Sequence, residues 1–474
     1  MSLDRTLDAG DTAPARANTV RRRIQGGLVA LGLIASAVLG PLTEPPTLWG
    51  LLPLGLFVVL LLIDLDIVIA AVVTSASALL VLGSNPAEAA GFLGDALGSD
   101  VLAIGMIIVL GGGLGEVLLR TGAAADLVRM IMRKLGDDSP ARAQLGIMLA
   151  SAVLVVALGT LIGAFALAAP LVIPIAARLG FTKSGTALML FVGGTCGMFV
   201  APFVGSMVAI RTASGISYPD FVLTAGGPLA VACFAAGFAL VRWNLRNPVD
   251  ADDYYSEEDE ADSSAEIPAH ARASTVAFLV AFVAIVAYAV IAGPGTAFAA
   301  LALLVMAAVA GFAGRLKATE LLTALYEGCG RLFNFLLMFW LLGALFLITE
   351  EINPYEVLMA QWGGNLQALG TFAFLIIVGL IGWLGIQGAS AAQVVLVDKI
   401  FGPTAAALGV PVPAWSVVLL ASAQADTYGP APGVNMIAPV GMARSTALKR
   451  VLYSSWILLF VSLAVYAVEL AILH

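Results

Sequence analysis

The chain is constrained above all by a series of long apolar runs. They include runs at about 27–43, 48–63, 65–83, 101–119, 219–242, 274–292, 296–313, 329–348 and 451–472. A helix needs roughly 20 apolar residues to span the hydrocarbon core of a bilayer, where only helices and closed barrels satisfy their backbone groups. Only 11% of the residues are charged, against about a quarter in soluble domains. The sequence therefore predicts an all-α polytopic membrane protein.

Basic residues between the runs set the expected orientation. Residues 21–23 are all arginine and precede the first run, which places the N-terminus in the cytoplasm by the positive-inside rule. Lys and Arg also follow the runs that end near 119 and 242, and they precede the run at 451–472. The loop at 84–100 has no Lys or Arg. About eleven transmembrane helices fit this pattern, with the N-terminus inside and the C-terminus outside.

An internal repeat is indicated by matches at one constant offset. Pro202 is matched by Pro430, and 430 − 202 = 228. Glycine is frequent, with 50 residues, so any single match is weak evidence for a repeat. The alternative is that residues match at this offset by accidental register. A constant offset over a long stretch is harder to obtain by chance. The other matched pairs are Gly83 and Gly311, Gly115 and Gly343, Thr121 and Thr349, Gly136 and Gly364, Gly205 and Gly433, and Ser217 and Ser445.

The loops of the two halves carry opposite charge. The loop after 101–119 is basic, whereas its counterpart after 329–348 is acidic. Equivalent loops on opposite sides of the membrane require an inverted-topology repeat with an odd number of spans in each half. Inverted repeats with paired broken helices point to a secondary transporter whose site lies between the halves.

The expected organisation has four parts. They are a cytoplasmic tail at 1–26, an N-terminal helix plus first repeat at 27–246, an acidic cytoplasmic linker at 247–273 and a second repeat at 274–474. The linker is expected to be solvated by composition, because much of the acid behind the net charge of −8 lies there. The tail is polar with no Ala-x-Ala-like site after the first run, so no cleaved signal peptide is predicted.

Enzymatic and metal-cluster chemistry has little support. Cys196, Cys233 and Cys329 have no metal-ligand spacing, and His270 and His474 are too few to build a cluster. No Ser/His/Asp, His-Glu-x-x-His or phosphate-loop pattern is present. We predict that the protein is not an enzyme and uses no cofactor beyond a coupling ion, H⁺ or Na⁺.

Residues 422–435 interrupt an apolar region with polar, proline and glycine residues, and they include Asp426. Charged side chains in a membrane are costly and mark functional sites. Asp426 is predicted to couple transport, either as a Na⁺ ligand or as a proton carrier. A structural pair with Arg444 is the alternative. Met198 occupies the matching position of the first half (426 − 228 = 198), so only the second half carries this charge.

Other candidates lie at the predicted breaks, which are 159–163 and 193–197 in the first half and 387–390 and 422–435 in the second. Their expected role is to offer side-chain and backbone groups to a substrate or ion. The alternatives are satisfaction of broken backbone and close helix packing by small residues. The candidates are Gln424, Thr427, Asn435, Ser422, Gln387, Ser390, Thr160, Gly159, Gly163, Thr195 and Gly194.

Two further predictions concern charged residues near span ends. Glu116 and Arg120, one helical turn apart, are expected to form an ion pair. Arg211 ends an apolar run and is interpreted as interfacial, with a substrate carboxylate as the alternative partner.

Three motifs resemble known carriers. The run Gly111-Gly-Gly-Leu-Gly to Asp126 resembles gluconate/proton symporters, and Gly388-Ala-Ser-Ala-Ala-Gln-Val to Leu408-Gly resembles lactate permeases. Gly159-Thr-Leu-Ile-Gly163 with the following prolines is similar to the first re-entrant hairpin of the ion-transporter superfamily. That superfamily includes gluconate, lactate, citrate and dicarboxylate carriers and one group of sodium/proton antiporters. The resemblance spans about 50–245 and 275–472.

The resemblance and the repeat together predict a secondary active transporter of small organic anions, mono- or hydroxycarboxylates. It would work by alternating access with H⁺ or Na⁺ symport. A sodium/proton antiporter is the alternative, and a channel or a non-transporting scaffold is more remote. Expected partners are the small anion or ion and membrane lipid, without nucleic acid, and a homodimer is left open. The protein is expected in the cell membrane as a multi-pass protein.

Overall fold

The chain is helical throughout the part that the structure describes. The computed structural model describes residues 12–63, 65–135, 139–257, 259, 268–293, 296–354, 356–358, 360–361, 370–383, 390–429 and 433–473. In these residues the only β contact is an isolated bridge between Thr182 and Tyr254. The all-α prediction is confirmed.

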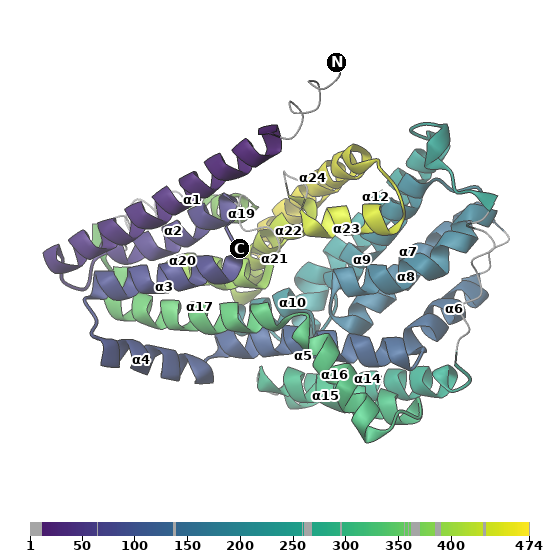
Figure 1. Cartoon of the computed structure of the whole chain (residues 1–474), viewed down its shortest axis with the longest axis horizontal. Helices are drawn as coiled ribbons and strands as arrows, with labels where there is room; N and C mark the ends of the chain where they lie inside the picture. Colours follow the sequence, from purple (N-terminus) through teal and green to yellow (C-terminus); the bar gives the residue numbers. More distant parts are fainter. Residues whose placement is uncertain are drawn as a thin grey trace, which may run out of the picture. The chain divides into compact units, whose positions relative to one another are not determined.

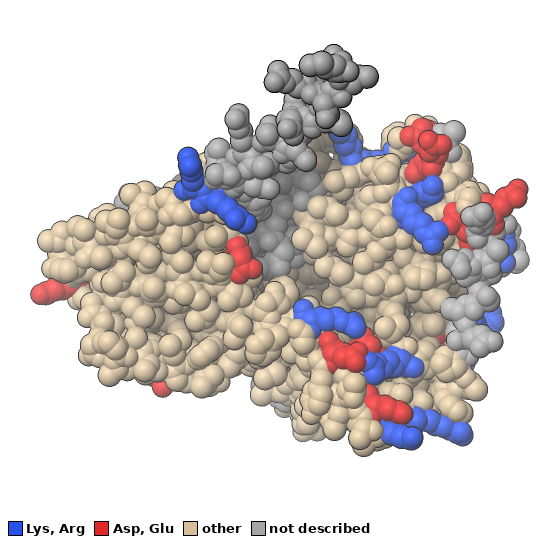
Figure 2. Space-filling view, viewed as in Figure 1, with Lys and Arg blue, Asp and Glu red and all other residues tan. Residues whose placement is uncertain are grey.

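Eight helices in the described residues are long and apolar enough to cross a membrane. Five shorter apolar helices accompany them, and Figure 2 shows a wide surface without charged side chains. The predicted multi-pass membrane protein is therefore confirmed. The eight fall on α1 (Thr12–Leu39), α5 (Asp100–Arg120), α7 (Pro140–Leu158), α8 (Leu161–Arg178), α12 (Gly227–Arg246, continuous with α11 from Tyr218), α14 (Ala271–Ala292), α17 (Phe333–Ile352) and α24 (Leu448–Leu473). The shorter ones are α2 (Leu51–Leu62), α3 (Ile67–Leu82), α15 (Ala297–Ala313), α19 (Thr371–Trp383) and α21 (Val412–Ala423).

Three segments between the predicted spans are helices, although two of them, within 84–100 and after 101–119, are expected to be loops. They are α4 (Pro86–Asp95), α6 (Ala123–Leu135) and α16 (Ala318–Gly330). None of the three contains a long apolar run, and long apolar runs are the feature from which helices are predicted in this sequence. α4 begins with a capping box, in which Asn85 accepts from the Glu88 backbone and Glu88 accepts from the Asn85 backbone. α1 also starts earlier than expected and includes the three arginines at 21–23.

Two compact units are distinguished by their internal contacts. One comprises Met1–Leu97 with Trp340–Trp362, and the other comprises Gly98–Phe339 with Gly363–His474. This division differs in kind from the predicted tail, repeats and linker, which stay a prediction.

In the first unit, α1 packs on α2 and α3. The buried hydroxyls of Ser36 and Ser77 lie 2.7 Å apart across the α1–α3 contact. The indole N–H of Trp340 donates to the Leu93 carbonyl at 2.8 Å, which joins α17 to α4. Polar contacts between helices thus supplement apolar packing in this unit.

In the second unit, helix boundaries recur at nearly the predicted offset. α8 begins at Leu161, and its counterpart α20 (Ser390–Ala407) is described from Ser390 onward. The starts of α9 (Lys183–Met198) and α21 differ by 412 − 183 = 229. Those of α10 (Gly205–Ser214) and α23 (Val434–Met442) differ by 434 − 205 = 229. This recurrence supports an internal repeat, and its inverted orientation stays a prediction.

The packing partners of the two short helices are also exchanged. α10 packs against α20 and α21, whereas its counterpart α23 packs against α8 and α9, the counterparts of α20 and α21. Figure 1 shows α7, α8 and α9 running alongside one another. The short helix of each half therefore packs on the broken helices of the other half.

The glycine-rich run at 193–197 is not a break. It lies inside α9, which continues to Met198. A Cβ added at Gly193 would overlap the carbonyl of Met148, and one at Gly197 would overlap that of Ala152. The prediction of a break here is wrong. The alternative, small residues that let α7 and α9 approach closely, is what the structure shows.

The described part of the acidic linker is attached to the second unit rather than freely solvated. The Asp253 carboxylate accepts from the Ser184 backbone N–H at 2.9 Å, at the N-terminus of α9, where a negative charge is favourable. Asp259 pairs with Arg444. The Ser256 backbone N–H donates to Asp259 and holds the pKa of that carboxyl below its ordinary value. Composition predicts the acidity of this segment but not its contacts.

Candidate functional site

Three helix beginnings and the first described turn of a fourth helix meet at one cavity in the second unit. The cavity has a volume of about 540 Å³, within the range of small-molecule sites. Its lining includes the first residues of α8, α10 and α23 and the first described residues of α20. These four helices are two matched pairs, α8 with α20 and α10 with α23. The lining residues at the helix starts are Leu161, Ile162, Gly163, Gly205, Ser206, Ser390, Ala391, Val434 and Asn435.

Three of these helix starts have no capping side chain. The N-cap residues Thr160, Val204 and Gly433 make no side-chain hydrogen bond to the first turns of α8, α10 and α23. The first backbone N–H groups of a helix have no intrahelical partner. Together with the positive end of the helix dipole they form a binding site for anions. The cavity is therefore suited to a negatively charged ligand.

The break between α7 and α8 is the one predicted from the sequence. α7 ends at Gly159, which adopts a left-handed conformation with φ of 69° that favours glycine. Thr160 is extended, and α8 starts at Leu161. A Cβ on Gly163 would lie 2.8 Å from the Thr160 methyl group. The local glycines thus end one helix and leave room for the start of the next.

Most of the cavity wall is apolar, with a few polar groups. The apolar part includes Phe335 and Phe339, and the uncharged polar side chains are those of Thr160, Ser206, Ser390 and Asn435. Among the described lining residues, Glu116 and Arg331 are the charged ones.

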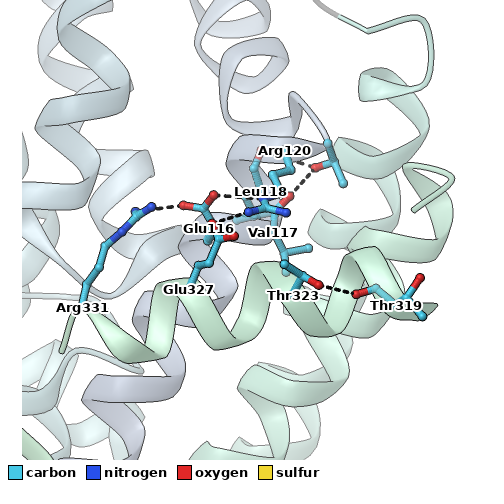
Figure 3. Close-up of polar contacts among 9 residues, drawn as sticks. Glu116, Val117, Leu118, Arg120, Thr319, Thr323, Glu327 and Arg331 are labelled. Carbon is cyan, nitrogen blue, oxygen red and sulfur yellow. Dashed lines mark hydrogen bonds and ion pairs between the residues drawn. The ribbon is translucent and has the colours of Figure 1, made fainter. Parts of the chain in front are cut away.

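Glu116 and Arg331 belong to a four-residue charge cluster (Figure 3). Arg120 Nε lies 3.1 Å from Glu116 Oε1, and Arg331 Nη1 lies 2.9 Å from Glu116 Oε2. Arg120 also pairs with Glu327. The Glu116 side chain is 7% exposed, whereas Arg331 is 63% exposed. The predicted Glu116–Arg120 pair is confirmed, and it forms part of a larger network.

Close backbone packing brings together α5, which contains Glu116, and α16, which Arg331 follows. A Cβ on Gly328 of α16 would lie 2.7 Å from the Gly113 Cα of α5. Arg331 follows Gly328 by three residues, and Glu116 follows Gly113 by three. Small residues on both helices therefore let α5 and α16 approach closely near the Glu116–Arg331 pair.

Five of the predicted site residues line this cavity. They are Gly159, Thr160, Gly163, Ser390 and Asn435, from both halves of the repeat. Gln387 lies outside the described residues. Asp426 lies on α22 (Ala425–Tyr428) between α21 and α23, and its side chain is outside the description. The break in the second half is thus where the sequence placed it.

The other candidates are buried beside the cavity rather than in its wall. The Ser422 hydroxyl donates to the Leu419 carbonyl at 2.7 Å, and the Thr427 hydroxyl to the Gln424 carbonyl at 3.3 Å. Gly194 packs on the Phe165 ring. For these residues the structure shows local packing and backbone contacts, the alternative that the sequence left open.

Thr195 contacts the second-half break directly. Its hydroxyl lies 2.8 Å from the Tyr428 hydroxyl. The Tyr428 ring is fully buried and packs edge-on against Phe191 and Phe199, with ring centroids 5.9 Å away in each case. This contact ties α9 of the first half to α22 of the second.

Gln424 lines a second, much smaller cavity of about 10 Å³. That volume is enough for about one water-sized group. Among the described residues, neither amide atom of Gln424 has a hydrogen-bond partner, although the residue is only 1% exposed. Met198 and Phe199, at the C-terminal end of α9, line the same cavity. Carbonyls at helix C-termini favour cations.

Arg211 lies in a different pocket, of about 330 Å³, on α10. Its guanidinium lies over the Tyr218 ring, 5.8 Å from the centroid. Arg211 is not among the residues that line the cavity of about 540 Å³ at the helix starts.

Arg331 and Ser206 were missed by the sequence analysis. Arg331 lies at the start of the span expected at 329–348, and a charge in an apolar run is itself a signal of function. Ser206 lies directly after Gly205, one of the glycines matched at the offset of 228, so the repeat already pointed near it.

The fold and cavity define a class of protein, the polytopic membrane carrier. The chain belongs to the DcuC family, the C4-dicarboxylate anaerobic carriers, whose profile it matches over residues 88–473. It is a carrier and not an enzyme. The narrower resemblance to gluconate and lactate carriers is not confirmed.

Two solved transporters share the fold. The Alcanivorax borkumensis YdaH transporter, described as having an unusual topology, is 17% identical with a TM-score of 0.58, covering 95% of this chain and 98% of its own. Neisseria gonorrhoeae MtrF, assigned to a class of antimetabolite efflux pumps, is 17% identical with a TM-score of 0.60, covering 93% and 98%. At this identity the likeness extends to the fold alone. No curated protein matches the sequence significantly.

Proposed function

We propose that this protein is a secondary carrier of C4-dicarboxylates that works by alternating access. The observation that carries the proposal is the meeting of three helix starts without side-chain caps, those of α8, α10 and α23, at one cavity. Backbone N–H groups at helix starts suit a carboxylate, and the family is named for C4-dicarboxylates. This narrows the substrate class expected from the sequence, mono- or hydroxycarboxylates, to acids with two carboxylates.

The coupling ion is proposed to bind at the break between α21 and α23. Asp426 lies on α22 within this break. The buried amide of Gln424, without a partner in the described residues, offers an oxygen at the end of α21. A carboxylate, an amide oxygen and helix C-terminal carbonyls are ligands that suit Na⁺, and the carboxylate alone could carry a proton. The ion, H⁺ or Na⁺, is therefore proposed to enter with the substrate.

The proposed transport cycle uses the exchanged packing of the two repeats. Because α10 packs on α20 and α21 while α23 packs on α8 and α9, a rocking of one set of helices moves the short helix of the other. Substrate held by the starts of α8, α10, α20 and α23 would then be exposed to alternate sides. Such movement around a fixed site is the usual mode for inverted-repeat carriers.

Uptake into proteoliposomes tests the proposal. Labelled succinate should accumulate when a pH or Na⁺ gradient is imposed, and only one of the two gradients should drive it. Asp426→Asn should reduce gradient-driven accumulation at least about tenfold, because it removes the coupling charge. Asp220→Asn, which changes an exposed carboxylate outside the cavity, serves as the control and should transport normally.

Each alternative gives a different result. Sodium flux driven by a pH gradient without dicarboxylate would identify an antiporter. Flux without accumulation would identify a channel. Full accumulation by Asp426→Asn would show that the coupling site lies elsewhere, while leaving the carrier function intact.

A further inference from the structure

Arg331 is the positive side chain among the described residues of the cavity wall. It follows α16 directly and is 63% exposed, so it is not locked in a packed interior. Among the described residues its ion-pair partner is the Glu116 carboxylate, at 2.9 Å. The cavity thus contains a guanidinium that is already paired with one carboxylate group of the protein itself.

The charge cluster allows Arg331 to change partners without stranding a buried charge. If Arg331 leaves, Glu116 keeps Arg120, whose Nε lies 3.1 Å away. Arg120 is in turn shared with Glu327, which is 48% exposed. Removing the sole partner of a buried charge is strongly unfavourable, but Glu116 would retain a cation.

We propose that Arg331 binds the second carboxylate of a dicarboxylate and exchanges its Glu116 partner for the substrate. This inference rests on the proposed function. One carboxylate lies at the helix starts, and the other pairs with Arg331 by the two-pronged geometry that guanidinium offers. The methylene groups between them pack on the apolar wall, near Phe335 and Phe339.

The exchange accounts for selection between acids with one and two carboxylates. A monocarboxylate fills the helix starts but leaves Arg331 on Glu116, so it gains nothing from the arginine. A dicarboxylate replaces Glu116 at Arg331. Glu116 is therefore a competitor for the same cation, and it sets how strongly a ligand must bind to displace it.

Binding of two size-matched ligands to purified protein tests this inference. Succinate and monomethyl succinate differ mainly in one charged carboxylate. Wild-type protein should prefer succinate, and Arg331→Gln should reduce that preference at least about tenfold while leaving monomethyl succinate affinity within about twofold. Glu116→Gln should tighten succinate binding several-fold, because it removes the competing charge.

Arg272→Gln is a matched control. Arg272 is an arginine of similar exposure, 57%, paired at 3.5 Å with a carboxylate that is 7% exposed, that of Asp126. It does not line the cavity. Its replacement should leave the preference for succinate unchanged.

The outcomes separate this inference from the proposed function. If wild-type protein prefers succinate and Arg331→Gln keeps that preference, the role of Arg331 is wrong and the carrier function stands. Equal loss of both ligands in Arg331→Gln would also overturn the role, because it would not be specific to the second carboxylate. If wild-type protein does not bind succinate, both proposals fail.

Discussion

At the scale of single residues, Glu469 is the least expected side chain in the described chain. It lies on α24 and is 7% exposed, and neither carboxylate oxygen has a hydrogen-bond partner among the described residues. A buried polar group without a partner costs about 1–3 kcal/mol. The buried carboxyl group of Glu469 therefore destabilises the fold.

Replacing Glu469 by an apolar residue tests this. Glu469→Leu should raise the melting temperature in detergent, because it removes an unpaired buried carboxyl group and adds apolar contact. Glu469→Gln keeps a polar group of the same shape and should change the melting temperature much less. A lower melting temperature for Glu469→Leu would show that the carboxylate has a favourable partner in the folded protein.

The contrast between Asp426 and Arg331 shows what residue types alone can predict. Asp426 stands out because prolines and glycines surround it within an apolar region. Arg331 lies at the edge of an expected span, where an interfacial arginine is ordinary. Its proposed role depends on its contact with Glu116, which joins the end of α16 to α5. How two packed helices are rotated about their axes cannot be predicted from the residues of one helix alone. The same limit applies to Tyr428, whose partner Thr195 is 233 residues away (428 − 195).

At the scale of elements, the sequence predicts a helix break correctly where glycine ends a helix. It does not distinguish such a glycine from one that lies inside a helix and lets a neighbouring helix pack closely. The run 159–163 contains Gly159 in a left-handed conformation and is a break. The run 193–197 is equally rich in glycine, yet it lies inside α9. Composition is similar in the two cases. What differs is the helix α7, whose backbone lies against Gly193 and Gly197.

This packing gives a second prediction. Alanine favours a helix over glycine by about 1 kcal/mol, so Gly193→Ala should stabilise α9 if only local propensity mattered. We expect the opposite, a fall of several degrees in melting temperature, because the new Cβ would overlap the Met148 carbonyl. Gly379→Ala in α19 is the control, since its Cβ would lie 3.8 Å from that of Ala421, an ordinary contact. Equal gains in stability from both variants would contradict the packing argument.

At the scale of the whole molecule, the repeat links sequence, fold and site. The offset of 228 was visible in the sequence from a few prolines, glycines and hydroxyl residues. The structure adds a shared offset of 229 in the starts of two helix pairs, α9 with α21 and α10 with α23, and an exchange of packing partners between α10 and α23. Sequence could not show that the helix starts meet at one cavity, because that follows from contacts between the halves.

Thiol labelling tests whether the two repeats have opposite orientations in the membrane. Ser217 and Ser445 are equivalent positions (445 − 217 = 228), and they lie just before α11 and α24. The distribution of basic residues places Ser217 outside and Ser445 in the cytoplasm. In a Cys329→Ser background, where the remaining Cys196 and Cys233 are buried, a membrane-impermeant maleimide should label Ser217→Cys in intact cells. It should label Ser445→Cys only after permeabilisation. Labelling of both variants from the same side would rule out inverted halves, and the cavity would then require another account of how it opens to each side.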